Sequence, residues 1–170
     1  MFKIAIADEP KNEVITVLRA RLTDYNSSAR TPSGSNWIYP DFPRLDLGKN
    51  SYPRISVMDV TETAEIIDIG RNMKYFPRLQ IDVWVWAGID GKDSNLITIS
   101  TVVYEWQKLL DLVARDVISA LDTNKSDFDD DTNILHNLKM LAKIDMGADP
   151  ERRQVIRKRI EISFEYYRGV

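Results

Sequence analysis

Few side chains in this sequence belong to types that carry out chemistry, and most of those are carboxylates. The chain has no Cys and a single His, His136. It therefore lacks the ligands of a zinc–thiolate site and the usual base for a Ser or Thr nucleophile. The motifs GxSxG, GxGxxG and GxxxxGKS/T, which mark hydrolase nucleophiles and phosphate-binding loops, do not occur. We expect no catalytic residue and no cofactor.

The best candidate for a cation site is the acidic run that begins at Asp122. Asp122, Asn124 and Ser126 alternate as the first ligands of a calcium loop do. The sixth position, however, is Asp127 in place of Gly, and the twelfth is Asn133 in place of Glu. We interpret residues 122–133 as a solvated acidic loop without a metal, with a divalent-ion site as the alternative.

Two acid-x-Lys triplets, Glu9–Lys11 and Asp90–Lys92, raise the question of a metal-dependent nuclease. Such enzymes place the acid and the Lys on a strand beside a second strand carboxylate. Here one triplet begins a predicted helix and the other lies in a predicted turn. A small nuclease or nucleic-acid-processing enzyme, using Asp82 and Asp90, therefore remains only an alternative hypothesis.

Charged residues gather in two blocks of opposite sign, although the whole chain is nearly balanced at 23 Lys plus Arg against 26 Asp plus Glu. The mild net charge of −3 argues against a dedicated nucleic-acid binder. The basic block could be a solvated strand face, could touch a nucleic-acid backbone, or could pair with the acidic block of a neighbouring copy. The blocks comprise Asp127, Asp129, Asp130 and Asp131, and Arg152, Arg153, Arg157 and Arg159.

Trp84 and Trp86 fall on the polar side of a predicted strand, in which Leu79, Ile81 and Val83 point the other way. Two neighbouring indoles on that side indicate that it is covered as well. Either a helix or another subunit could cover it. We therefore include both Trp residues, with the two charged blocks, in a predicted interface with another subunit or partner.

The elements that must position these residues fit one α+β domain over residues 1–170. Its composition, 44% hydrophobic and 29% charged, is that of a globular protein, and no apolar run approaches the length that crosses a membrane. We expect a mixed or mostly antiparallel sheet with an N-terminal helix and one long amphipathic helix packed on it. The predicted elements are a helix at 9–24 with Asp8 as N-cap, a flexible polar loop at 25–36, strands at 55–60, 64–69 and 79–87, a helix at 96–122, and a C-terminal hairpin of strands 138–146 and 154–167.

A short pattern of aromatic, Pro, Arg and aliphatic residues occurs three times, at 42–45, 52–55 and 76–79. Since Pro has no N–H to donate, it suits the first residue of a strand, and we interpret all three as strand entries. In the last strand Lys158 falls on the apolar side and interrupts the pattern.

The order of these elements resembles the tail-terminator and tail-completion proteins of long-tailed viruses and prophages. The resemblance rests on the Tyr-Pro-Arg-Ile-Ser-Val strand at 52–57, the strand Leu-Gln-Ile-Asp-Val-Trp-Val-Trp at 79–86, the Leu-Leu-Asp-Leu-Val helix at 109–113, and the closing Arg-Lys-Arg-Ile-Glu-Ile-Ser-Phe-Glu-Tyr strand at 157–166. It covers most of residues 9–168.

This resemblance implies a virion protein without enzymatic activity, made in the host cytoplasm. Such proteins close the tail tube as a ring, commonly a hexamer, and join it to the head connector. The implied partners are further copies, a tail-tube protein and a head-connector protein, with DNA passing through without sequence-specific binding and no contact with a membrane. A cellular α+β interaction module is the third hypothesis.

Overall fold

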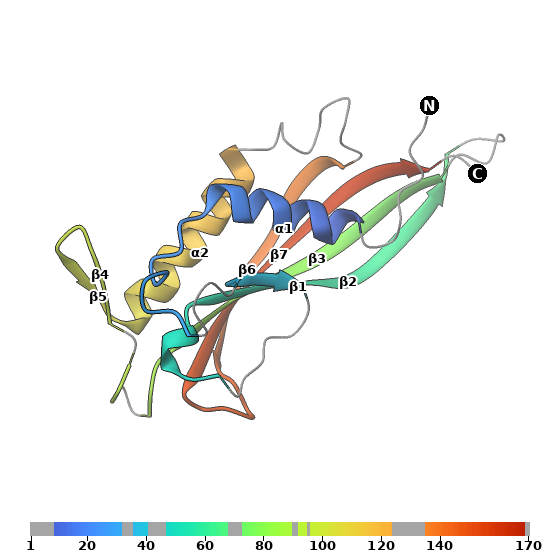
Figure 1. Ribbon diagram of the computed structural model, residues 1–170. Helices are drawn as coiled ribbons and strands as arrows, with labels where there is room; N and C mark the ends of the chain where they lie inside the picture. Colours follow the sequence, from blue (N-terminus) through green and yellow to red (C-terminus); the bar gives the residue numbers. More distant parts are fainter. Residues whose placement is uncertain are drawn as a thin grey trace.

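The computed structural model describes residues 9–31, 36–40, 47–67, 73–89, 92–94, 96–123 and 135–168 (Figure 1). The predicted N-cap Asp8 and most of the acidic loop lie outside these residues. The described elements are α1 (Glu9–Arg21), β1 (Ile38–Pro40), the 3-10 helix η1 (Lys49–Ser51), β2 (Arg54–Ile66), β3 (Met73–Trp86), β4 (Ile97–Ile99), β5 (Val102–Tyr104), α2 (Trp106–Thr123), β6 (His136–Ala148) and β7 (Val155–Arg168).

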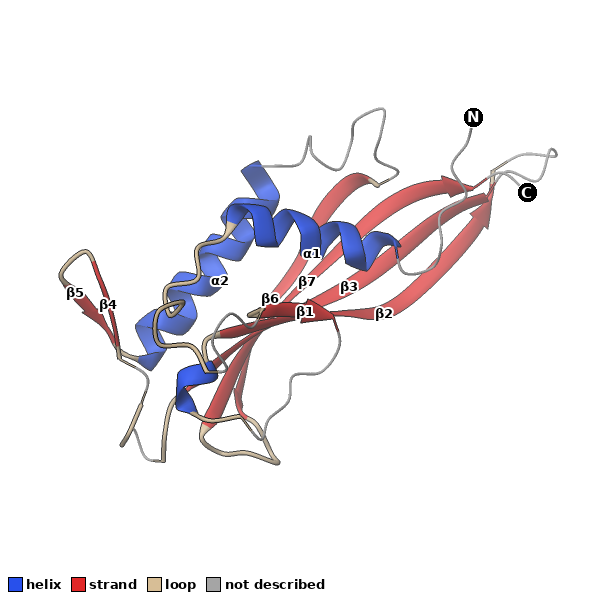
Figure 2. Cartoon of the chain, viewed as in Figure 1, coloured by secondary structure: helices blue, strands red, loops and turns tan. Residues whose placement is uncertain are grey.

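The main sheet has five strands in the order β1-β2-β3-β7-β6. The short strand β1 is parallel to β2, and every other neighbouring pair is antiparallel. Both α-helices lie on the same face of this sheet (Figure 2). The predicted α+β class with a mixed sheet is therefore confirmed.

Strict alternation along β3 builds the core between the sheet and the helices. Ile81 and Val83 are fully buried on the face that meets α2, where Leu109 and Val117 are also fully buried. Leu18 of α1 joins the same core. Because successive strand residues point to opposite faces, the intervening residues of β3 face away from both helices.

The long strands run past the ends of both helices (Figure 1), although Phe164, Glu165 and Tyr166 of β7 remain buried in this outer part of the sheet. By contrast, every residue of β2 from Asp59 to Ile66 is exposed. The side chain of Ile66 is 76% exposed. Among the described residues, the outer part of β2 is thus the exposed margin of the sheet.

The predicted helix at 96–122 begins too early, since α2 starts at Trp106. Residues 97–104 instead form the β4–β5 hairpin, with Ile99 paired to Val102 across a two-residue turn. Both turn residues, Ser100 and Thr101, have positive φ (47° and 72°), as a type I′ turn requires. The apolar residues here satisfy a helical period and a strand period equally well, and the chain lacks the Asn-Gly signal. None of the described helices has the length and apolarity needed to span a membrane.

Strand β2 joins what we predicted as two strands, at 55–60 and 64–69. A register shift between Asp59 and Thr61 marks a β-bulge at Val60. The bulge changes which residues face the helices without ending the strand. The alternation of apolar and polar residues is therefore interrupted at Val60, although the strand continues. Residues 68–72 lie outside the described part.

The three Pro-Arg segments do not share one role. Pro53 directly precedes β2, as predicted for a strand entry. Pro77 lies in the middle of β3, and the β3–β7 pairing has no partners for Phe76 and Pro77, consistent with the missing N–H. The first segment, 42–45, lies outside the described residues.

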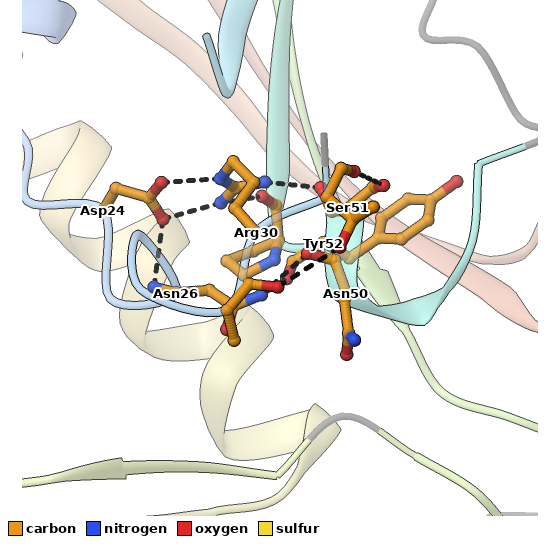
Figure 3. Close-up of polar contacts among 9 residues, drawn as sticks. Asp24, Asn26, Arg30, Asn50, Ser51 and Tyr52 are labelled. Carbon is orange, nitrogen blue, oxygen red and sulfur yellow. Dashed lines mark hydrogen bonds and ion pairs between the residues drawn. The ribbon is translucent and has the colours of Figure 1, made fainter. Parts of the chain in front are cut away.

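The predicted flexible loop at 25–36 is in part a rigid clamp on the start of β2 (Figure 3). Arg30 is buried, donates two hydrogen bonds of 2.6 Å to the carboxylate of Asp24, and reaches the carbonyl oxygen of Pro53 at 2.9 Å. Asn26 donates to the carbonyl oxygen of Tyr52 at 2.8 Å. The polar composition of residues 25–36 suggested a flexible loop. In the structure, however, the polar side chains of Asn26 and Arg30 hydrogen-bond to backbone carbonyl groups that have no partner in a strand or helix.

The β4–β5 turn yields a stability prediction. Thr is β-branched and strained at positive φ, whereas Gly is not. We expect Thr101→Gly to raise the free energy of unfolding by about 1 kcal/mol. Thr98→Gly, in the strand of the same hairpin, should lower it, because Gly weakens a strand interior. Thermal and urea unfolding of both variants measure the difference; equal effects of the two would contradict the turn assignment.

Candidate interaction surface

The functional candidates meet on the face of the sheet that points away from the helices. Two cross-strand rows over β2, β3 and β7 form it: Arg54 pairs with Trp84, which pairs with Arg157, and Ser56 pairs with Asp82, which pairs with Arg159. We call Arg54, Asp82, Trp84, Arg157 and Arg159 the arginine face. Register alone brings these residues together, since they come from strands far apart in the sequence.

Asp82 is the fully buried carboxylate at the centre of the arginine face. Arg159 donates to it from Nε at 3.0 Å and from Nη2 at 3.1 Å, which is a bidentate fork. Gln80 donates from Nε2 at 3.0 Å, and Arg157 approaches from Nη1 at 3.4 Å. The negative charge of Asp82 is therefore largely committed to Arg159.

Trp84 and Trp86 lie beneath arginine side chains instead of under a helix. Trp84 is fully buried, donates from Nε1 to Ser56 Oγ at 3.0 Å, and carries the guanidinium of Arg157 at 5.0 Å from its ring centroid. Trp86 donates to the carbonyl oxygen of Asp93 at 3.0 Å and carries Arg152 at 5.0 Å. With Tyr52 and Val155 the indoles form a second, small core. A partner would meet the guanidinium groups before the indoles.

Arg54 is the unexpected member of this surface. It is only 9% exposed, and its guanidinium lies 4.5 Å from the ring centroid of Tyr39. Its Nε has no hydrogen-bond partner, and neither does the hydroxyl of Tyr39. Burial raises the pKa of that hydroxyl, against the opposing charge of Arg54, so the phenol remains a neutral donor. No carboxylate within the described chain pairs with Arg54.

The arginine face is consequently out of charge balance. Arg157 and Arg159 share the carboxylate of Asp82, and Arg54, which is as well buried as many apolar side chains, has no carboxylate partner among the described residues. A buried charge without a partner is expensive, since desolvation is not repaid by Coulomb attraction. The arrangement would be completed by acidic groups supplied from outside this part of the chain.

The predicted site residues are only partly brought together. Arg152, Arg157 and Arg159 join Trp84 and Trp86 on or beside the arginine face, whereas Arg153 is exposed in the turn between β6 and β7. The predicted acidic residues Asp127, Asp129, Asp130 and Asp131 lie outside the described residues. Sequence reasoning missed Arg54 and Tyr39, although the 52–55 segment was in view. The period-2 pattern of β3 was the signal that placed Asp82 beside Trp84.

For the nuclease alternative, Asp82 is held by two arginines and Asp90 lies outside the described residues. Within the described ranges no group of three or more His, Cys, Asp or Glu side chains is arranged to hold a metal ion. No observation in this part of the chain favours that hypothesis.

A second charged group sits on the helix face, where Lys158 interrupts the apolar pattern. Its ammonium donates to Asp111 of α2 and lies 3.0 Å from Asp145 of β6. Burial alone lowers the pKa of Lys158, but the hydrogen bonds to the two carboxylates outweigh it and raise the pKa overall. Around these groups is a cavity of about 560 Å³, whose wall includes Trp106 and Lys108.

Glu165 of β7 collects the third group of charges. Lys74 lies 2.7 Å from its carboxylate, Asn137 donates from Nδ2 at 2.7 Å, and Lys139 lies 3.8 Å away. The hydrogen bond from Lys74, supported by Asn137, lowers the pKa of Glu165 against the opposing effect of burial. These contacts connect β3, β6 and β7 in the half of the sheet beyond the helices.

No protein-family model matches this sequence, and no match to a curated protein was found either.

The contacts of the arginine face predict that neutralising the carboxylate of Asp82 lowers the free energy of unfolding considerably. Asp82→Asn keeps the shape but leaves Arg157 and Arg159 without their counter-charge, and we expect it to lower the free energy of unfolding by about 3 kcal/mol. Asp59→Asn is the control, because Asp59 is 46% exposed where it pairs with Lys11, and should cost under about 1 kcal/mol. Urea unfolding compares them, and similar losses would refute the central role of Asp82.

The lowered pKa of Glu165 predicts a pH dependence. Its contribution to stability is fully present above its ordinary pKa of 4.5 and is lost as the pH falls through the lower value in the folded protein. Glu165→Gln should therefore be less stable than wild type near pH 7, and this difference should shrink as the pH falls below about 4.5. Urea unfolding from about pH 7 to about pH 3 tests this. A pH-independent difference would contradict it, and the exposed residue change Glu105→Gln is the control.

Proposed function

We propose that this chain is a structural virion subunit that assembles into a ring, closes the tail tube of a long-tailed virus and joins it to the head connector. The layout of the sequence supports this reading. The observation that carries it is the pair of open edges of the sheet, which differ from each other in sequence and in charge.

The first open edge is β6, which pairs only with β7 among the described strands. Three register irregularities interrupt that pairing. Met140, Leu141 and Ile144 are large apolar residues left exposed along it, and Lys139 and Lys143 add positive charge. Bulges and lysines are how proteins discourage indiscriminate pairing of an edge, while exposed apolar residues indicate a partner.

The second open edge is the outer half of β2. Strand β1 covers only Ile55 to Val57, and within the described residues β2 pairs only with β3 from Met58 to Ile66. Val60 and Ile66 are exposed apolar residues here, and Asp59, Glu62 and Glu65 make this stretch acidic. It is thus opposite in charge to β6.

Two different edges favour a head-to-tail contact, because the surface that binds is not the surface that is bound. Repetition of such a contact about an axis gives a closed ring. Strands β2 and β7 run one way and β3 and β6 the other. Hence β6 beside β2 of the next copy would continue the antiparallel alternation. A closed ring has no free edge and would leave a bore for DNA to pass without sequence-specific contacts.

Light scattering on the purified chain, with negative-stain microscopy, tests the proposal. We expect a ring of defined mass, and binding of this ring to the ends of purified uncapped tail tubes. Leu141→Glu should reduce the mass to that of the monomer, because it removes an apolar contact and places a carboxylate against the acidic outer half of β2. Leu96→Glu is the control, since Leu96, beside the β4–β5 hairpin, is also an exposed apolar residue, 61% exposed against 43% for Leu141.

A monomer at every concentration that also fails to bind tube ends would refute this function. Reversing Arg157 and Arg159 to Glu is a poorer test of assembly, because both residues hold Asp82 and their loss would also weaken the fold.

A further inference from the structure

The charge imbalance of the arginine face calls for an acidic partner. Arg159 is committed to Asp82 by two hydrogen bonds, and Arg157 shares that carboxylate only at 3.4 Å. Arg54 is buried, its Nε has no hydrogen-bond partner, and no carboxylate of the described chain pairs with it. The guanidinium groups of Arg54 and Arg157 lie 4.5 and 5.0 Å from the centroids of the Tyr39 and Trp84 rings. A guanidinium placed over a ring can still bind a carboxylate in the bidentate manner through its two Nη atoms.

We propose that the arginine face binds the acidic segment Asp127–Asp131 of a second copy of this chain, with Arg54 and Arg157 as the principal ligands. This inference rests on the proposed ring, since it names a contact between its subunits. It assigns the leading role to Arg54, which is absent from the basic block at 152–159.

The spacing of the charges suits an extended acidic peptide. Arg54 and Arg157 flank Trp84 on the two neighbouring strands, and two strand spacings are about 10 Å. In an extended chain, residues three apart, such as Asp127 and Asp130, are also separated by about 10 Å. The segment carries four carboxylates and one Lys over residues 124–134.

The acidic segment of the same chain is badly placed to reach this surface. From Thr123 to His136 the backbone can span at most about 45 Å. His136 pairs with Glu165, which lies about 26 Å along β7 from Arg157. Thr123 lies about 18 Å along α2 from Asp111, the partner of Lys158. To reach the arginine face and return, the segment from Thr123 to His136 would have to be fully extended. It would also have to pass around the sheet to the face opposite α2.

An acidic protein segment fits better than nucleic acid. The net charge of −3 would repel a polyanion at long range. The two indoles lie beneath arginine side chains and are not free to stack on bases. Two or three carboxylates, by contrast, would balance the local excess of positive charge.

The first experiment uses the full-length Leu141→Glu chain, a monomer by the preceding prediction, as the receptor. The probe is a fluorescent peptide of residues 124–134, and its anisotropy is measured during titration. We expect saturable binding that weakens with added salt. It should fall at least tenfold with Arg54→Met, but should be unchanged with Arg78→Met, in which an exposed arginine of the same face is lost.

The second experiment uses complete chains. Asp127→Asn, Asp129→Asn, Asp130→Asn and Asp131→Asn in one chain should weaken self-association at least tenfold in sedimentation equilibrium. Arg54→Met should do the same, and a mixture of the two should associate more tightly than either alone, because each supplies what the other lacks. Thermal unfolding of Arg54→Met should show no loss of stability in the monomer, since a buried unpaired charge is removed.

Three results would overturn the inference: no peptide binding, an Arg54→Met effect equal to that of Arg78→Met, or unchanged association of the Asn variant. Tight binding of an oligonucleotide with the same dependence on Arg54 would overturn it in favour of nucleic acid. If the chain forms rings and caps tubes while the peptide fails to bind, only this inference is lost. If the peptide binds but no chain caps tubes, the contact stands and the proposed function is lost.

Discussion

The buried carboxylate of Asp82 is the constraint on which the outer face of the sheet depends. Arg159 can lie against the sheet because Asp82 accepts its fork of hydrogen bonds. Arg157 then lies over Trp84, and the indole is sealed without a helix above it. A five-stranded sheet with helices on one face would otherwise expose two indoles to water. Here the negative charge of Asp82 holds the arginine side chains that cover the indoles.

The arginine face carries more positive charge than its one carboxylate can neutralise. A protein selected for stability alone would replace Arg54 by an apolar side chain, because a buried ion rarely repays its desolvation. Ionic groups of this kind gain their value from specificity, since they penalise every arrangement in which the partner is missing. In the proposed ring, the open edges would attract apolar and oppositely charged neighbours without fixing their position, and the arginine face would add a stricter condition on that position.

The sequence predicted what local periodicity records and missed what strand register decides. The alternation from Leu79 to Ala87 correctly separated the core face of β3 from its polar face, and it placed Asp82 beside Trp84. The start of α2 was misplaced because eight residues are too few to distinguish a helical period from a hairpin. The clamp made by Arg30 and the isolation of Arg54 depend on residues far away in the sequence, and no local pattern contains such contacts.

The open edges of the sheet and the buried Arg54 could both be satisfied by the same kind of partner. An open sheet edge needs backbone partners along its length, and a buried arginine needs a carboxylate at one point. A free ligand could supply the second but not the first, and an unrelated strand could supply the first without the second. A further copy of this chain would bring both, because it carries an edge of opposite charge and the acidic segment Asp127–Asp131. Assembly with itself therefore accounts for more of the structure than binding of any single ligand would.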